Sequence, residues 1–205
     1  MYARAAKQHA YAALNNVRED GSTYHTFNFN PITGEPIKGE NEGGYSDESC
    51  WSRGQSWAVY GFSLAYLHTG CKEFLDAAIK CADYFIANTP KGTVPLWDFK
   101  LDDKTDTNVD TSAAAIACCG LYTIAEITGD KQHYVEAADY MLSTLIKNHS
   151  HVFDDESEAL MDCGYTGAIE NGKRIVNQSG TIFGDYFYME ALVRRTGHSV
   201  RIWDL

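Results

Sequence analysis

The sequence has little positive charge and no long apolar run. Its 17 Lys and Arg residues stand against 28 Asp and Glu residues, which gives a net charge of -11. This balance argues against nucleic acid or an anionic membrane surface as a partner, because both attract positive charge. No apolar stretch looks long enough to span a bilayer, so we expect no membrane segment. The start of the chain, residues 1–6, lacks the apolar core of a signal peptide, and none is expected.

Metal-binding and disulfide patterns are also missing. The six cysteines form no CxxC pair, and no group of Cys and His residues has the spacing of zinc ligands. We therefore expect reduced, buried thiols in a cytoplasmic protein, with no metal and no cofactor. The chain also lacks a phosphate loop, an HExxH motif and a Ser/His/Asp order. These absences argue against a P-loop nucleotide-binding protein, a zinc metalloprotease and a serine hydrolase.

Helical hairpins repeat along the chain. The dipeptide Thr-Gly closes three helical runs, and glycine just past a helix end is the expected left-handed cap. The alanine pairs at 77–78 and 137–138 are equivalent at a period of about sixty residues, which indicates stacked α-hairpins. The pattern predicts helices over residues 2–17, 54–69, 72–88, 110–127, 131–148 and 184–195.

The two helices of each hairpin differ in polarity. The first, as in 57–67 and 113–127, is the more apolar, and the second is more amphipathic. This difference suggests an inner and an outer ring of helices. The segment 3–17 resembles a second-type helix with no first-type partner, so we expect the chain to begin within a repeat. Three hairpins would leave an open apolar edge, which more chain or self-association would cover.

The connections between helices carry other signals. Alternating residues over 23–30, followed by turn residues 31–34, predict a short β-hairpin. His25 shares one face of it with two phenylalanines. It is either a ligand-binding histidine or an edge-strand histidine bonded to backbone. The glycine-rich, polar segment 164–180 is expected to form a long flexible loop.

The most informative segment runs from Trp51 to Trp57 and reads Trp-Ser-Arg-Gly-Gln-Ser-Trp. On a helix, Arg53 and Trp57 project from one face, one turn apart. A guanidinium beside indole rings suits a flat or ring-shaped ligand with a carboxylate, such as an acidic sugar. An aromatic core helix whose arginine satisfies a buried carboxylate is an equally open interpretation.

No carboxylate stands out as a tuned acid. Asp110 precedes Thr111 and a run of alanines, so it is expected to cap a helix. Asp185, near the start of an aromatic helix, suits the helix dipole or a buried partner.

Several motifs together resemble one enzyme family. Tyr24-His25-Thr26-Phe27, Gly44-Tyr45-Ser46-Asp47, the run 51–62, residues 110–116 and residues 180–186 resemble, in this order, the unsaturated glucuronyl hydrolases of glycoside hydrolase family 88. Arg-Gly-Gln-x-Trp followed by Tyr-Gly-Phe is the most specific element. The resemblance covers nearly the whole chain and implies an all-α fold of the (α/α)6 barrel type. Residues 1–205 would form the C-terminal part of a single domain, roughly half of the toroid, with about three helical hairpins and a short β-hairpin.

The resemblance also implies a reaction. The family acts on oligosaccharides made by polysaccharide lyases, with a 4,5-unsaturated uronic acid at the non-reducing end. An aspartic acid protonates C4, water adds at C5, and the hemiketal rearranges to release the sugar. By position, Arg53 would pair with the uronate carboxylate or a neighbouring group, Trp51 and Trp57 would form walls against the sugar rings, and His25 would hydrogen-bond the unsaturated sugar.

The chain departs from the family pattern in two places. The family's two essential aspartates lie upstream of everything matched, so we expect this chain to supply the substrate-binding wall without a catalytic residue. Gly43 stands where the family commonly has a glutamine. Two other hypotheses remain: a non-catalytic helical scaffold or sugar-binding protein, and an unsaturated rhamnogalacturonyl hydrolase of family 105. The Arg-Gly-Gln-x-Trp run favours glucuronyl over rhamnogalacturonyl substrates.

Overall fold

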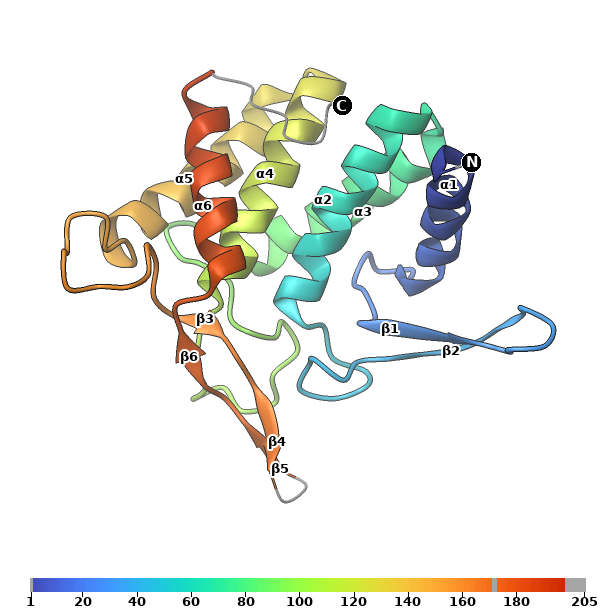
Figure 1. The fold of residues 1–205 in the computed structure, drawn as a ribbon, viewed down its shortest axis with the longest axis horizontal. Helices are drawn as coiled ribbons and strands as arrows, with labels where there is room; N and C mark the ends of the chain where they lie inside the picture. The colour runs from blue at the N-terminus through green and yellow to red at the C-terminus, as the bar shows by residue number, and fades with distance from the viewer. Residues whose placement is uncertain (1, 171–172, 198–205) are drawn as a thin grey trace.

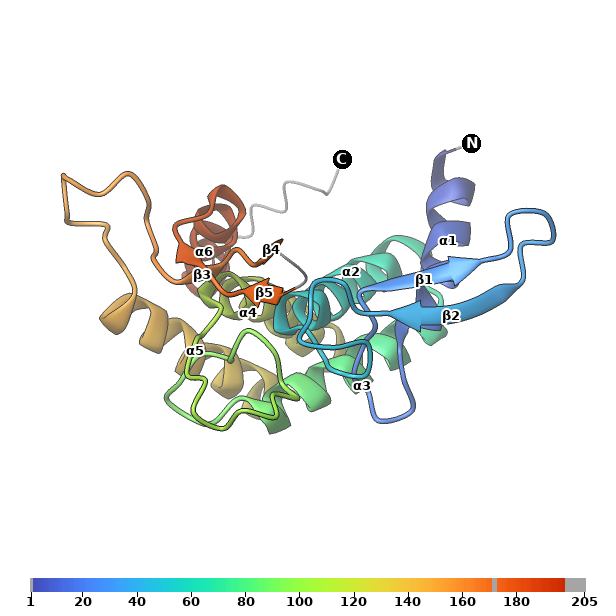
Figure 2. The ribbon, with the colours of Figure 1, turned by 90° about the horizontal axis from the view of Figure 1, so that it is seen from below.

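The computed structural model describes residues 2–170 and 173–197, and α-helices form two layers within this part of the chain (Figure 1). The helices α2, α4 and α6 lie side by side, and α3 and α5 form a second layer against them (Figures 1 and 2). The predicted inner and outer helices are therefore confirmed. Their bounds are α1 Tyr2–Ala13, α2 Ser52–Thr69, α3 Lys72–Asn88, α4 Thr111–Thr128, α5 Lys131–Asn148 and α6 Ile182–Arg195.

The centre of the fold is α4, in which every residue from Thr111 to Ala125 is buried. It contacts α2, α5 and α6. Small residues allow this close packing. At Gly120, an added Cβ would lie 2.8 Å from Val59 Cγ1 and 2.9 Å from the Tyr60 nitrogen on α2. A larger side chain there would push the two inner helices apart.

Sequence signals account for most helix ends. Gly70 and Gly129 cap α2 and α4 in the left-handed conformation, with φ of 67° and 78°. The third Thr-Gly pair ends α6, where Thr196 is the C-cap and Gly197 has φ of 79°. Asp110 caps the start of α4, since its side chain accepts hydrogen bonds from the backbone nitrogens of Ser112 and Ala113.

The predicted β-hairpin is present. Strand β1 (Thr26–Phe29) pairs with antiparallel β2 (Pro36–Glu40). The turn between them follows from Asn30, whose side-chain oxygen accepts hydrogen bonds from the nitrogens of Ile32 and Thr33. The rings of Phe27 and Phe29 lie 5.5 Å apart, as expected for side chains on one face.

Three sequence-based expectations need correction. The first helix ends at Ala13, and residues 14–16 form a 3-10 turn. The segment 164–180 was predicted to be a flexible loop, but it forms two short antiparallel pairs: β3 (Gly164–Tyr165) with β6 (Gln178–Ser179), and β4 (Ala168–Glu170) with β5 (Lys173–Ile175). The prediction missed them because two- and three-residue strands carry no periodic signal.

The sequence was expected to contain no apolar stretch long enough to span a membrane, and this expectation is wrong by length and composition. Residues 111–128 of α4 are long and apolar enough by length and composition, yet 83% of this stretch is buried inside the protein. Its apolar surface contacts other helices, so α4 is the core helix of the two-layered fold.

Candidate functional site

The loop before α2 is fixed by one buried carboxylate. Asp98 accepts hydrogen bonds from Tyr45 N (2.9 Å), Ser49 Oγ (2.6 Å), Cys50 N (3.1 Å) and Lys100 N (2.9 Å). Because the chain at 45–50 is held this way, Trp51 enters α2 in an extended conformation and begins the helix without a side-chain cap.

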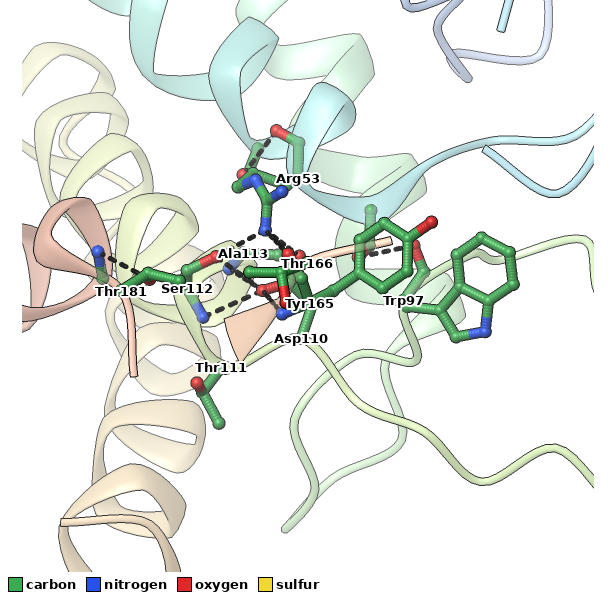
Figure 3. Close-up of polar contacts among 12 residues, drawn as sticks. Arg53, Trp97, Asp110, Thr111, Ser112, Ala113, Tyr165, Thr166 and Thr181 are labelled. Atoms are coloured by element: carbon green, nitrogen blue, oxygen red, sulfur yellow. Dashed lines mark hydrogen bonds and ion pairs between the residues drawn. The ribbon is translucent and has the colours of Figure 1, made fainter. Parts of the chain in front are cut away.

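Arg53 projects from the first turn of α2 into a buried polar cluster (Figure 3). Its Nη1 atom donates to Asp110 Oδ2 (2.7 Å), Ser112 Oγ (3.0 Å) and the Tyr165 carbonyl oxygen (2.8 Å). These partners come from the start of α4 and from β3, so one side chain joins three segments. The side chain of Arg53 is only 10% exposed and that of Asp110 is fully buried.

The cluster satisfies Asp110 completely. Its Oδ1 atom accepts from Ser112 Oγ (2.5 Å) and from the nitrogens of Ser112, Ala113 and Tyr165. Burial raises the pKa of the Asp110 carboxyl, while the Arg53 guanidinium and these hydrogen bonds oppose the rise. Both oxygens accept hydrogen bonds within the fold, so Asp110 is placed to hold Arg53 and to cap α4.

Asp185 is likewise a structural acceptor. It lies in the first turn of α6, and its Oδ1 atom accepts from the nitrogens of Leu160 and Met161, both at 3.1 Å. The prediction of a helix-dipole or buried-partner role is therefore confirmed for Asp185. Asp98, Asp110 and Asp185 are therefore all held by hydrogen-bond donors within the fold.

Trp51 links Arg53 to His25. The guanidinium carbon of Arg53 lies 4.6 Å from the centre of the Trp51 ring, and the His25 ring packs edge-on against the same indole at 4.7 Å. The Nδ1 atom of His25 accepts a hydrogen bond from Gly43 N (2.9 Å), which makes Nε2 the protonated nitrogen of a neutral ring. Within the described residues, Trp51 Nε1 is a buried donor with no acceptor.

An open hollow of about 300 Å³ lies beside this row of side chains. It is bounded by α1, by the approach to β1 and by α2, and its lining includes His25, Gly54, Trp57 and Phe62. Trp57 is 38% exposed and rests edge-on against Phe187 of α6. An exposed indole and an exposed imidazole thus face one concave surface of a size suited to a sugar ring.

A second hollow, of about 500 Å³, lies on the outer layer between the end of α3 and the start of α5. Its lining includes Lys91, His133 and Tyr140 and none of the four predicted site residues. It is the larger of the two, but the hollow at α2 is the one that meets the predicted binding residues.

The structure thus divides the predicted residue set. His25 and Trp57 line the open hollow, Trp51 lies behind His25, and Arg53 points away into the buried cluster. Of the two interpretations left open for Arg53, pairing with a buried carboxylate is the one observed, because its Nη1 atom donates to Asp110. Sequence reasoning missed Tyr165 and Phe183, which contact Arg53 from more than a hundred residues away, because no local pattern marks them.

The sequence predicted reduced and mostly buried cysteines, and the structure agrees. All six are free; Cys50, Cys81, Cys118 and Cys119 are buried, and the other two are half-buried. Burial raises the pKa of the Cys50 and Cys81 thiols to about 12. These four thiols are core side chains without nucleophilic character.

No protein-family model matches the chain. The unsaturated chondroitin disaccharide hydrolase of Streptococcus pneumoniae is 41% identical to it over 199 residues, which is 94% of this chain and 49% of that protein. The unsaturated glucuronyl hydrolase of Bacillus sp. GL1 is 36% identical over 94% of this chain and 52% of that protein. Its crystal structure aligns with a TM-score of 0.86 over 95% of this chain and 52% of that one.

A mutant unsaturated glucuronyl hydrolase from Streptococcus agalactiae, solved in complex with dGlcA-GalNAc6S, aligns with a TM-score of 0.72 at 37% identity, over 92% of this chain and 50% of that one. In each of these alignments the chain spans about half the length of its relative.

Proposed function

Because the chain is a homologue of the unsaturated glucuronyl hydrolases and has the helical fold of their barrel, we propose that it forms the sugar-binding wall of such an enzyme. The ligand is an oligosaccharide that carries a 4,5-unsaturated uronic acid at its non-reducing end, with an unsaturated chondroitin disaccharide as the first candidate. The homology agrees with the resemblance drawn from the sequence, and the substrate and the whole reaction belong to the proposal.

The observation that carries this proposal is the hollow at α2. An indole offers a flat apolar face to the carbon face of a sugar ring, and Trp57 lines the hollow with 38% of the residue exposed. His25 lines the same hollow and is exposed, so its imidazole is placed to contact a sugar bound there. The unpaired Trp51 Nε1 supports a ligand or ordered water nearby, because buried donors normally have an acceptor.

Arg53 has a supporting role in this proposal. Its Nη1 atom is committed to Asp110, Ser112 and Tyr165. The cation also lies over the Trp51 ring, so Arg53 fixes the tryptophan against which His25 packs. Any contact with the uronate carboxylate would fall to Nε and Nη2, for which the described residues offer no hydrogen-bond partner.

The proposed reaction is hydration of the vinyl ether. A proton adds to C4, water adds to C5, and the hemiketal opens to release the remaining sugar. The proton donor must be a carboxylic acid with a raised pKa near the double bond. Asp98, Asp110 and Asp185 are all engaged by donors within the fold, so we assign them no part in the chemistry and give this chain the binding role.

The proposal is tested by calorimetric titration of the purified chain with an unsaturated chondroitin disaccharide, together with the ultraviolet absorbance of the conjugated double bond. We expect saturable binding without loss of absorbance, and at least a tenfold weaker affinity in Trp57→Ala. The matched control is Tyr140→Ala, an aromatic of the outer hollow that is 46% exposed, which should bind as wild type.

Three results would contradict the proposal. Binding that Tyr140→Ala weakens and Trp57→Ala does not would move the site to the outer hollow. A folded chain that binds no disaccharide would favour the helical scaffold hypothesis. Steady loss of absorbance in the wild-type chain would contradict the binding-only assignment and lead to Asp98→Asn and Asp185→Asn as the next variants.

We also propose a cytoplasmic location. The support is chemical: six free thiols persist where the surroundings are reducing. Fractionation of cells that make the protein would test it, and recovery with secreted proteins would contradict it.

A further inference from the structure

A second cluster of reactive side chains lies at the base of the loop between α5 and β3. The loop closes on itself through His151 N, which donates to the Leu160 carbonyl (2.9 Å), and Asp162 N, which donates to the His149 carbonyl (3.2 Å). Residues 149–151 and 160–162 therefore run side by side as a short antiparallel clamp. This clamp brings together side chains that the sequence separates by more than ten residues.

Three types of metal ligand meet at this clamp. His149 Nδ1 lies 2.9 Å from Asp162 Oδ1, and the ligand atoms of His149, Asp162 and Cys163 all lie within 4.8 Å of one another. His151 Nε2 lies 3.2 Å from the other carboxylate oxygen of Asp162. The side chains of His149 and Asp162 are 17% and 42% exposed, so an ion can enter from solvent.

Hydrogen bonds from the start of α4 to the backbone of Asp162 and Cys163 fix the position of the cluster. Thr111, the first residue of α4, donates its nitrogen to the Cys163 carbonyl (3.2 Å) and its hydroxyl to the Asp162 carbonyl. Cys163 has φ of 55°, which makes it the one described residue other than glycine with a positive φ. The fold therefore holds Cys163 in an unfavourable backbone conformation, which fixes the position of its side chain.

We propose that His149, Asp162 and Cys163 bind a divalent transition-metal ion, with zinc as the best match. Imidazole nitrogen, thiolate sulfur and carboxylate oxygen are the donors that zinc accepts in proteins, and a thiolate disfavours magnesium and calcium. The hydrogen bond from His151 orients the second oxygen of Asp162, as outer partners of metal ligands do. Three protein ligands leave a coordination position for water.

Sequence spacing predicted no metal site. His149 and His151 come directly after α5, whereas Asp162 and Cys163 follow a loop of about ten residues, so no zinc pattern of local pairs exists. The proposal also differs from the sugar site: its ligands line neither hollow. It is connected to the Arg53 cluster through the backbone, since Cys163 lies two residues before Tyr165, and through Thr111, which follows Asp110 and donates to the carbonyls of Asp162 and Cys163.

The test uses zinc ion alone as the probe. The full chain is freed of metal with a chelator and titrated with Zn²⁺ by calorimetry, and a parallel titration with Co²⁺ is followed by absorbance. We expect one equivalent of zinc to bind, cobalt to give a thiolate charge-transfer band, and the thermal midpoint to rise with zinc. Cys163→Gly should abolish the charge-transfer band and weaken zinc binding at least tenfold.

The choice of glycine guards against unfolding, because glycine adopts a positive φ without strain. Asp162→Asn is the second variant, with the same expected loss. The matched controls are Cys71→Ser, a half-buried thiol elsewhere, and His133→Ala. The second removes an exposed histidine that pairs with Asp83 at 3.2 Å and has no third metal ligand beside it among the described residues. Both controls should bind zinc as wild type.

The proposal fails if the folded wild-type chain binds no zinc, in which case the cluster is a hydrogen-bonded His-Asp-His group. It fails equally if Cys163→Gly keeps wild-type affinity and the cobalt band. Neither result bears on the disaccharide titration, so the two proposals stand or fall separately.

Discussion

Arg53 and Trp57 lie one turn apart near the start of α2, and their environments are opposite. The Arg53 side chain is 10% exposed and bonds to two other segments of the chain, whereas Trp57 is 38% exposed in an open hollow. Helical spacing placed the two residues on one face but could not show what each would meet. The difference separates a residue that builds the fold from one that is available to a ligand.

His25 and Trp51 repeat this contrast on a smaller scale. The two rings touch at 4.7 Å, yet His25 is exposed and Trp51 is 9% exposed. Trp51 lies between the buried cation of Arg53 and the exposed imidazole. Substitution of the buried Arg53 is therefore expected to reduce stability, and substitution of the exposed His25 or Trp57 is expected to reduce sugar binding.

The largest effect is expected from Arg53→Ala. The substitution leaves Asp110 buried without its cation, and breaking a buried ion pair in this way costs about 3–5 kcal/mol. Urea unfolding followed by far-ultraviolet circular dichroism measures the change. The matched control is Lys72→Ala, which removes an exposed pair with Asp76 at 2.8 Å and should leave the midpoint unchanged. Equal effects of the two variants would contradict a structural role for Arg53.

A smaller effect is expected from Tyr60→Phe on the same helix. The Tyr60 hydroxyl donates to Glu190 Oε1 at 3.0 Å, and Arg194 pairs with the same carboxylate at 2.8 Å. Loss of the hydroxyl keeps this ion pair, so we expect a cost of about 1.5–3 kcal/mol for one hydrogen bond to a charged group. The same urea experiment measures it. A loss as large as that in Arg53→Ala would mean that hydrogen bonds to buried carboxylates, rather than unpaired charge, decide stability here.

His25→Ala should change stability by less than about 1 kcal/mol, because the imidazole is exposed. The same variant should bind the unsaturated disaccharide at least tenfold more weakly than wild type. Calorimetry and urea unfolding of one sample give both numbers. A His25→Ala variant that loses stability and keeps its affinity for the disaccharide would show that His25 supports the fold and does not bind sugar.

A pH-dependent effect is expected at the turn that leads to His25. Burial raises the pKa of the Asp20 carboxyl, but hydrogen bonds from Ser22 and Lys100 outweigh this and lower it from 3.8 to about 2. A lowered folded-state pKa stabilises the fold above pH 3.8, and this contribution is lost as pH falls toward 2. Thermal midpoints of wild type and Asp20→Asn should therefore converge between these pH values. Midpoints that stay parallel would show that Asp20 makes no such contribution.

The sequence predicted the helices better than it predicted the site. Periodic alanines and the Thr-Gly caps are local signals, and the helices they indicated lie within a few residues of those observed, with the largest difference at the end of α1. The cap at Asp110 followed from the same local rules. The strand pattern grouped His25 with two phenylalanines, but β1 begins at Thr26, so His25 lies just before the strand.

The remainder of the site depends on distant contacts. The contact of Arg53 with Tyr165 joins residues 112 positions apart, and the short strands around Tyr165 have no periodicity to read. The group formed by His149, Asp162 and Cys163 likewise depends on a loop that folds back on itself. In both places the backbone, rather than the spacing of residue types, brings the side chains together.

The most direct test of the account is an NMR titration of the chain with the unsaturated chondroitin disaccharide, read at the indole N–H and imidazole signals. Trp97, whose Nε1 donates to Asp106 at 2.9 Å and which is 2% exposed, is the internal reference. The account predicts saturable shifts at Trp57, His25 and Trp51 with Trp97 unmoved. Shifts confined to Trp97, or none at Trp57 and His25, would contradict it.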